Sequence, residues 1–116
     1  MSVRIKRVYD EADPADGFRV LVDRIWPRGV SKENAHVDEW LKEIGPSTEL
    51  RKWYGHEKER FDEFRTRYIA ELTHNDAVEQ LRGYLSEHPD VTLVFSAHDS
   101  ETSQAAVLRD YLAGSG

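Results

Sequence analysis

The chain has 116 residues, a formal net charge of −6 and no cysteine, so disulfide bonds, thiol catalysis and cysteine-ligated metal sites are excluded. Its length fits one domain of about 100–150 residues, and its 39% hydrophobic and 33% charged residues are typical of a folded soluble protein. No apolar run approaches the ~20 residues of a membrane span, and the N-terminal residues lack the apolar core of a signal peptide. The sequence therefore predicts a single domain over residues 1–116, located in the cytoplasm and without a membrane partner.

The negative charge is unevenly distributed. Acidic residues dominate residues 57–116, whereas residues 1–32 carry a small basic excess. An acidic surface is repelled by the phosphate backbone of nucleic acids, although a local arginine cluster can still hold one small anion. The charge pattern favours a small anionic ligand over nucleic acid as a partner, and it leaves the oligomeric state open.

The first half of the chain contains two strand patterns and one ambiguous segment. Residues 3–9 alternate between apolar and polar side chains, which predicts a strand, and residues 10–17 are rich in turn-forming residues. Residues 18–25 include an unbroken β-branched run, typical of a central strand that is buried on both faces. Residues 36–44 fit either a helical stripe or a half-buried strand, because both periodicities are satisfied.

The second half of the chain consists of helical patterns and one more apolar run. These patterns predict a helix capped by Ser47 and stopped at Gly55, then an amphipathic helix from 57 to 72 and a helix from 78 to 85. They also predict a strand in the apolar run at 91–98, which Asp90 precedes, and a last helix that opens at Asp99–Ser100. The order of elements predicts an α/β fold with a small, mainly parallel sheet of three to four strands flanked by helices.

Ligands of such sheets bind at the carboxyl ends of the strands, which here are residues 23–31 and 96–103. In the first segment, Asp23 and Arg24 follow a buried strand, and Trp26 and Arg28 flank a proline. Arginine side chains in this position suit a carboxylate or a phosphate. The alternative is a stiff turn, in which an ion pair between Asp23 and an arginine locks the loop and Trp26 belongs to the core.

The second segment joins a strand to a helix. Such a junction directs free N–H groups toward an anion, and His98 beside it is a candidate general acid or base, since histidine often has this role in enzymes. The alternative is an ordinary helix start, in which Asp99 or Ser100 only caps the helix. The other histidines lack metal-ligand spacing and no glycine-rich phosphate loop is present, so neither a metal nor a cofactor is predicted.

Five segments together resemble one known family: KRVYD (6–10), DGFRVLVDRIWPRGVSK (16–32), DEWLKEIGPSTELRKWYGH (38–56), FRTRYIAEL (64–72) and LVFSAHDSETSQAAVLRDYL (93–112). They identify the chain as similar to the DUF488 family, in its short YeaO-like branch, which has no established activity. The resemblance implies a strand over residues 36–42 and places both candidate segments at one sheet edge. Longer members have cysteine, cysteine and histidine where this chain has Ser96, Ser103 and Gln104, so a thiol mechanism does not transfer.

The sequence thus predicts a site that binds a small anionic metabolite or nucleotide, with hydrolase or transferase activity as an open question. Asp23, His98 and Asp99 are the candidate proton-transfer residues, and the candidate ligand-binding residues are Arg24, Trp26, Arg28, Ser47, Ser96 and Ser100. The alternative is a non-catalytic regulatory or protein-interaction module. A DNA-binding regulator is disfavoured, because no helix-turn-helix with a basic recognition helix is present.

Overall fold

The computed structural model describes residues 2–114 and contains a sheet of four strands that all run parallel. The strands are β1 (Ser2–Arg7), β2 (Phe18–Leu21), β3 (Glu39–Trp40) and β4 (Asp90–Phe95), and their spatial order is β1-β4-β2-β3. β4 and β2 are therefore the inner strands, as the unbroken apolar runs predict. The α/β fold and the small parallel sheet are confirmed.

The connections between the strands are helical. In the described part of the chain, the α-helices are α1 (Lys32–Ala35), α2 (Thr48–Tyr54), α3 (Phe61–Thr73), α4 (Ala77–Glu87) and α5 (Gln104–Gly114), and the 3₁₀ helices are η1 (Pro14–Asp16), η2 (Lys42–Ile44) and η3 (Lys58–Arg60). None of these helices is long and apolar enough to span a membrane.

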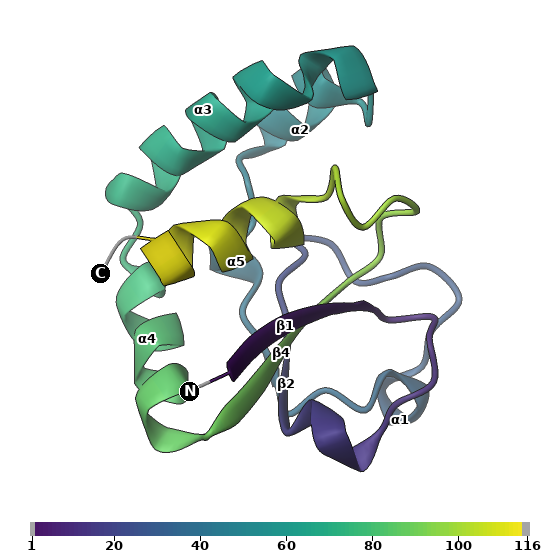
Figure 1. Ribbon diagram of the computed structural model, residues 1–116. Helices are drawn as coiled ribbons and strands as arrows, with labels where there is room; N and C mark the ends of the chain where they lie inside the picture. Colours follow the sequence, from purple (N-terminus) through teal and green to yellow (C-terminus); the bar gives the residue numbers. More distant parts are fainter. Residues whose placement is uncertain (1, 115–116) are drawn as a thin grey trace.

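The two faces of the sheet are covered differently. The main core lies between β2 and β4 and the helices α2 to α5, and it includes Val20, Leu93 and Phe95, all with no exposed surface. The hydrophobic core on the opposite face is smaller. There Leu21 and Val94 pack against residues of α1 and the loops. Figure 1 shows α3 and α5 on one side of the strands and α1 on the other. The candidate segments, residues 23–31 and 96–103, follow the two inner strands.

Residues 36–44 combine two local structures. The Asp38 N–H donates to the Arg19 carbonyl at 2.8 Å and the Leu41 N–H donates to the Leu21 carbonyl at 2.9 Å, so the segment pairs with β2 only briefly. The chain then turns into η2, whose Ile44 is completely buried. A short edge strand followed by one 3₁₀ turn explains why both periodicities fit this segment. The strand implied by the family resemblance is present, but it is limited to Glu39–Trp40.

The helix that follows begins and ends where the sequence predicts. The Ser47 hydroxyl accepts a hydrogen bond from the Leu50 N–H at 3.1 Å, which satisfies a free donor of the first turn of α2. Gly55 adopts a left-handed conformation with φ of 52°, which glycine enters at little cost. These two residues determine the position of α2 against the carboxyl end of the sheet.

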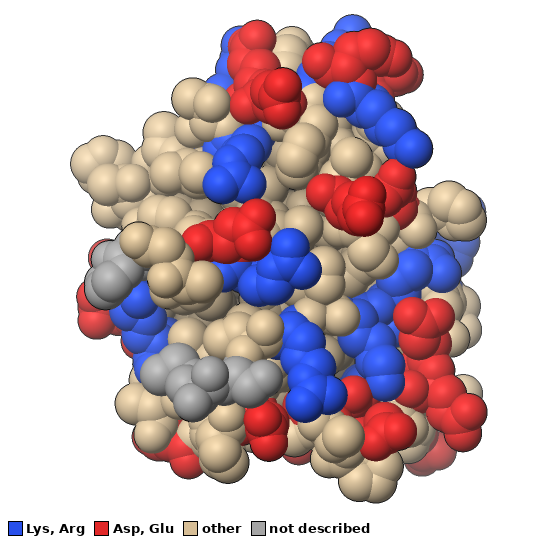
Figure 2. Space-filling view, viewed as in Figure 1, with Lys and Arg blue, Asp and Glu red and all other residues tan. Residues whose placement is uncertain are grey.

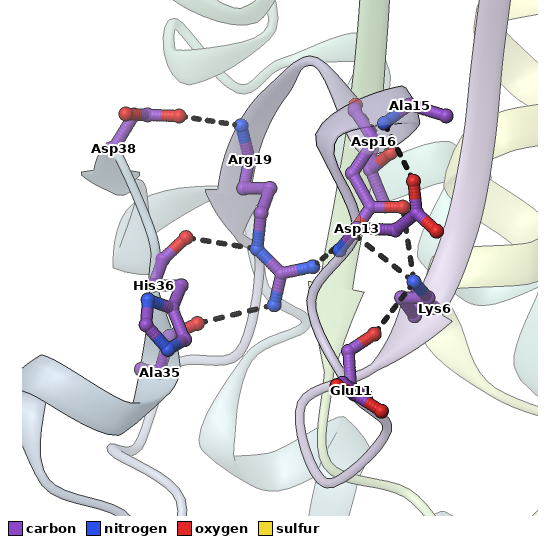
Figure 3. Close-up of polar contacts among 10 residues, drawn as sticks. Lys6, Glu11, Asp13, Ala15, Asp16, Arg19, Ala35, His36 and Asp38 are labelled. Atoms are coloured by element: carbon purple, nitrogen blue, oxygen red, sulfur yellow. Dashed lines mark hydrogen bonds and ion pairs between the residues drawn. The ribbon is translucent and has the colours of Figure 1, made fainter.

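A polar cluster lies beside the amino end of β2, away from the candidate segments (Figure 3). The Asp16 carboxylate accepts hydrogen bonds from the side chains of Lys6 at 3.0 Å and Arg19 at 2.5 Å. The Arg19 guanidinium also donates to the carbonyls of Ala35 at 3.1 Å and His36 at 2.8 Å. The buried charges are therefore paired and hydrogen-bonded, as burial requires.

Candidate functional site

A cavity of ≈ 210 Å³ lies at the carboxyl ends of β2 and β4. Its floor is formed by residues that follow these strands, including Asp23 and Ser96, together with Gln104 at the start of α5. One wall is formed by α2 and the residues after it, including Arg51, Lys52 and His56. The cavity is thus located where parallel sheets bind ligands.

Asp23 is the central residue of the floor and is only 6% exposed. One carboxylate oxygen accepts a hydrogen bond from the Ser96 N–H at 2.9 Å, and the other accepts one from the Gln104 side-chain amide. Among residues 2–114, no basic side chain forms an ion pair with this carboxylate. Burial raises the pKa of Asp23 above the ordinary aspartate value, although its hydrogen bonds oppose this effect.

Arg51 is the main cationic group of the wall. Its Nε atom is buried and has no hydrogen-bond partner in the described part of the chain. Its Nη2 atom makes a single long contact of 3.4 Å with the Thr48 hydroxyl. Lys52 and His56 line the same wall. The Arg51 guanidinium therefore has N–H donors that the described residues leave unused.

The aromatic residues of the cavity have structural roles. The Tyr54 hydroxyl donates to the Thr102 carbonyl at 2.7 Å, which ties α2 to the loop before α5. The Tyr54 ring stacks on Phe64 with the ring centroids 4.2 Å apart. Burial raises the pKa of Tyr54 above the ordinary value, so at neutral pH its hydroxyl is protonated and remains a donor. These contacts fix the shape of the wall.

Arg24 lines the cavity, but its guanidinium is engaged by the turn between η2 and α2. Its Nε donates to the Pro46 carbonyl at 2.9 Å, and its Nη2 donates to the Gly45 carbonyl at 2.7 Å. A Cβ atom on Gly45 would lie 3.1 Å from the Arg24 backbone nitrogen, so glycine permits this close approach. Arg24 therefore holds the turn that leads into α2.

Trp26 and Arg28 lie outside the cavity. The Trp26 Nε1 donates to the Val30 carbonyl at 2.6 Å, and its ring meets Trp40 edge-on with the centroids 5.3 Å apart. Arg28 is exposed, and its carbonyl accepts a hydrogen bond from the Tyr9 hydroxyl at 3.0 Å. This part of the first segment forms a turn held by its own contacts, but the ion pair between Asp23 and an arginine that belongs to the alternative interpretation is not present among residues 2–114.

The remaining candidates also lie away from the cavity lining. Ser47 caps α2, and its hydroxyl donates to Glu71 at 2.6 Å. His98 is exposed. The Lys58 ammonium lies 2.9 Å from Asp99 and lowers the pKa of that carboxyl. The Ser100 carbonyl accepts a hydrogen bond from the Ser103 hydroxyl at 2.7 Å.

The structure therefore brings together Asp23, Arg24 and Ser96 from the sequence-based set and adds residues that the sequence did not single out. The most important additions are Arg51, Lys52, His56 and Gln104. The sequence predicted the helix that carries Arg51, but no periodicity indicates which of its polar residues faces the sheet edge. Gln104 was noted only for its difference from longer DUF488 proteins, and its contact with Asp23 spans 81 residues of chain.

The arrangement has two chemical capacities. The wall offers charge-assisted donors to an anion, and the Asp23 carboxylate can accept hydrogen bonds beyond the two it already makes. Among residues 2–114, no group of three or more histidine, cysteine, aspartate or glutamate side chains is placed to hold a metal ion.

Comparison with known proteins identifies relatives that span nearly the whole chain. Uncharacterised proteins of Mycobacterium tuberculosis H37Rv and Mycobacterium bovis are each 49% identical over 112 residues, covering 97% of this chain and 94% of theirs. The uncharacterised protein YeaO of Escherichia coli K12 is 43% identical over 112 residues, covering 97% of each chain. No solved structure matched the chain.

One family model also matches, over residues 2–115, and it is described as the inactive DUF488-N3 subclade. The match covers every element of the sheet and both candidate segments. The similarity to YeaO over nearly the full length of both proteins agrees with the resemblance to the short YeaO-like branch. The chain therefore belongs to the DUF488 family, within its inactive DUF488-N3 subclade.

Proposed function

We propose that the protein is a non-catalytic receptor for a small anionic ligand, which binds in the cavity at the carboxyl ends of β2 and β4. The observation that carries the proposal is the Arg51 guanidinium, which lines the cavity and, among the described residues, makes a single long hydrogen bond, to the Thr48 hydroxyl. A guanidinium has five N–H donors, so an anion in the cavity would pair with donors that the protein leaves free. Lys52 on the same wall would add positive charge.

Two observations support a receptor over a hydrolase or transferase. The subclade is described as inactive. In addition, the three residues that the sequence predicts for proton transfer are separated: Asp23 lines the cavity, whereas His98 is exposed outside it and Asp99 is paired with Lys58. General acid–base catalysis requires such groups within hydrogen-bond reach of one substrate. Hydrolase or transferase activity is therefore not part of the proposal.

The charge distribution supports a small ligand over a nucleic acid. On the face shown in Figure 2, basic side chains are interspersed with acidic ones. Nucleic-acid binding sites typically present Lys and Arg clustered along one face. The formal charge of −6 would further weaken the attraction to a phosphate backbone.

The proposal is tested by thermal unfolding with a panel of anions, including phosphate, sulfate, acetate, succinate and adenosine monophosphate. A binding anion at about ten times its Kd is expected to raise Tm by about 5 °C, since it stabilises the folded state by about 1.4 kcal/mol. Arg51→Met keeps an unbranched apolar stem but removes the guanidinium and its charge, and it should abolish the shift. Arg109→Met, which alters an arginine of α5 outside the cavity, should retain it.

Two results would contradict the proposal. In the first, no anion of the panel shifts Tm, which would favour the alternative of an interaction module. In the second, Arg51→Met and wild type respond equally while Arg109→Met loses the shift, which would place the anion elsewhere on the protein. Unfolding of each variant without ligand shows whether the fold is retained.

A further inference from the structure

The size and the walls of the cavity restrict the ligands that fit. Its volume of ≈ 210 Å³ is below the ~300–1,000 Å³ typical of sites for drug-sized molecules. The Phe64 ring is 1% exposed and lies between Tyr54 and Tyr68, with centroid distances of 4.2 and 5.7 Å. It therefore has no free face on which a nucleotide base could stack. A ligand of amino-acid size fits these restrictions.

The cavity has a positive wall and a negative floor, which come from different elements. Arg51 and Lys52 belong to α2, whereas Asp23 follows β2. A phosphate or a dicarboxylate that pairs with the wall would bring a second negative charge into the same small space as the Asp23 carboxylate. Repulsion between like charges is strong where water is partly excluded. The Asp23 carboxylate is therefore expected to weaken the binding of ligands that carry negative charge only, relative to ligands that also carry a positive group.

The Asp23 carboxylate has unused capacity to accept hydrogen bonds. An ionised carboxylate offers about four lone-pair sites, and the donors to Asp23 among the described residues are the Ser96 N–H and the Gln104 amide. Both donors are uncharged. His56 in the same cavity lowers the pKa of Asp23 through its charge, but it forms no hydrogen bond or ion pair with this carboxylate among the described residues. A buried carboxylate without a direct cationic partner is costly, and a ligand ammonium would provide that partner.

The opening of the cavity is apolar on one side. Ile25 lines the cavity and yet is 61% exposed, so its side chain stands at the boundary between the cavity and solvent. Burying an aliphatic side chain is favourable relative to leaving it exposed to water. A ligand with an apolar group would cover Ile25, and this burial would increase its affinity.

We propose that the ligand is an α-amino acid with a small aliphatic side chain. Its carboxylate pairs with Arg51 and Lys52, its ammonium pairs with Asp23, and its side chain covers Ile25. This inference rests on the proposed function, because it specifies the ligand class of the same cavity. It departs from an anion-only ligand in requiring a positive group opposite Asp23.

The test compares three molecules that share the same isobutyl carbons, measured by isothermal titration calorimetry on the whole chain at constant ionic strength. They are L-valine, isovalerate, which lacks the ammonium, and isobutylamine, which lacks the carboxylate. L-valine is expected to bind at least about tenfold more tightly than either analogue, because isovalerate leaves the buried Asp23 carboxylate without a cationic partner and isobutylamine leaves Arg51 and Lys52 without an anionic one. This comparison uses the wild-type protein and does not depend on whether a variant folds.

Two variants test whether the ammonium of L-valine binds at Asp23. Asp23→Asn should weaken L-valine binding by about tenfold or more while leaving isovalerate binding unchanged or tighter, since the repulsion from Asp23 is removed. Asp62→Asn, at an exposed position of α3 outside the cavity, should change neither. If isovalerate or phosphate binds wild type as tightly as L-valine, the amino-acid inference is wrong while the anion receptor stands. If none of the three binds although an anion of the wider panel does, the inference is also wrong.

Discussion

Two buried aspartates flank β2, and their surroundings are opposite. Asp16 precedes the strand, is 3% exposed and accepts hydrogen bonds from two cationic side chains, those of Lys6 and Arg19 (Figure 3). Asp23 follows the strand, is 6% exposed and accepts hydrogen bonds from uncharged donors. Burial opposes ionisation at both positions. At Asp16 the hydrogen bonds and the nearby charges prevail and lower the pKa, whereas at Asp23 burial prevails and raises the pKa.

The presence of cationic partners at Asp16 and their absence at Asp23 distinguish a structural carboxylate from a candidate binding group. The protein itself neutralises Asp16, so this residue has no capacity left for a cationic ligand. Asp23 is buried to a similar extent, but it lacks such a partner and lies in a cavity. Burial and residue type are therefore insufficient to identify a site, and the balance of charge around the buried group is the informative property.

The largest expected effect is at Asp16. Asp16→Asn removes the negative charge that pairs with the buried Arg19 guanidinium, and an uncompensated buried charge costs about 3–5 kcal/mol. Urea denaturation should show a decrease of this size in the free energy of unfolding. Asp10→Asn, in the exposed part of the same loop, is the control and should change stability by less than about 0.5 kcal/mol. A loss below about 1 kcal/mol for Asp16→Asn would break the distinction between the two aspartates.

A smaller loss is expected at Gln104. Gln104→Ala removes one of the two donors to Asp23, and a hydrogen bond to a charged group contributes about 1.5–3 kcal/mol. Because Gln104 is partly exposed, water can replace part of this bond, so we expect a loss of about 1–2 kcal/mol in urea denaturation. The matched control is Gln80→Ala, which removes an exposed hydrogen bond to Tyr84 and should cost less than about 0.5 kcal/mol. Equal losses in the two variants would mean that Gln104 does not stabilise the buried carboxylate.

The smallest expected change, with the opposite sign, is at Asp23. Asp23→Asn removes a buried charge that has no cationic partner, and the asparagine can still accept from the Ser96 N–H while its amide donates to a rotated Gln104 side chain. The free energy of unfolding at neutral pH should therefore be unchanged or higher than in wild type. Denaturation of this variant beside Asp16→Asn measures the contrast directly. A loss comparable to that of Asp16→Asn would show that the ionised form of Asp23 is needed for folding.

The free energy of unfolding should depend on pH in opposite ways through Asp16 and Asp23. A raised pKa in the folded state means that ionised Asp23 costs stability above the ordinary aspartate pKa of about 3.9, and the cost disappears as the pH falls below this value. The lowered pKa of Asp16 has the reverse effect, since its contribution is present above that pKa and is lost as the pH falls through the folded value. Differences between each variant and wild type should therefore shrink in denaturation series taken from neutral pH to below about pH 4. If the stabilisation by Asp23→Asn increased as the pH falls, the result would contradict a raised pKa of Asp23 in the folded state.

The sequence by itself determined the order of the elements and the sheet edge that carries the cavity. Unbroken apolar runs specify inner parallel strands, and the residues at 47 and 55 specify the ends of α2, because these signals depend on neighbours a few positions away. Asp23 and Ser96 were recognised for the same reason: each follows an apolar run that predicts a strand, and strand ends lie at the ligand-binding edge.

Only the tertiary structure decided which polar side chains share the cavity. Arg24 and Arg28 look equivalent in the sequence, yet one guanidinium is engaged by backbone carbonyls and the other side chain is exposed on the surface. Arg51 and Gln104 enter the site from helices far from Asp23 in the chain. Whether a buried charge is compensated depends on contacts between distant segments, and local periodicity contains no information about them.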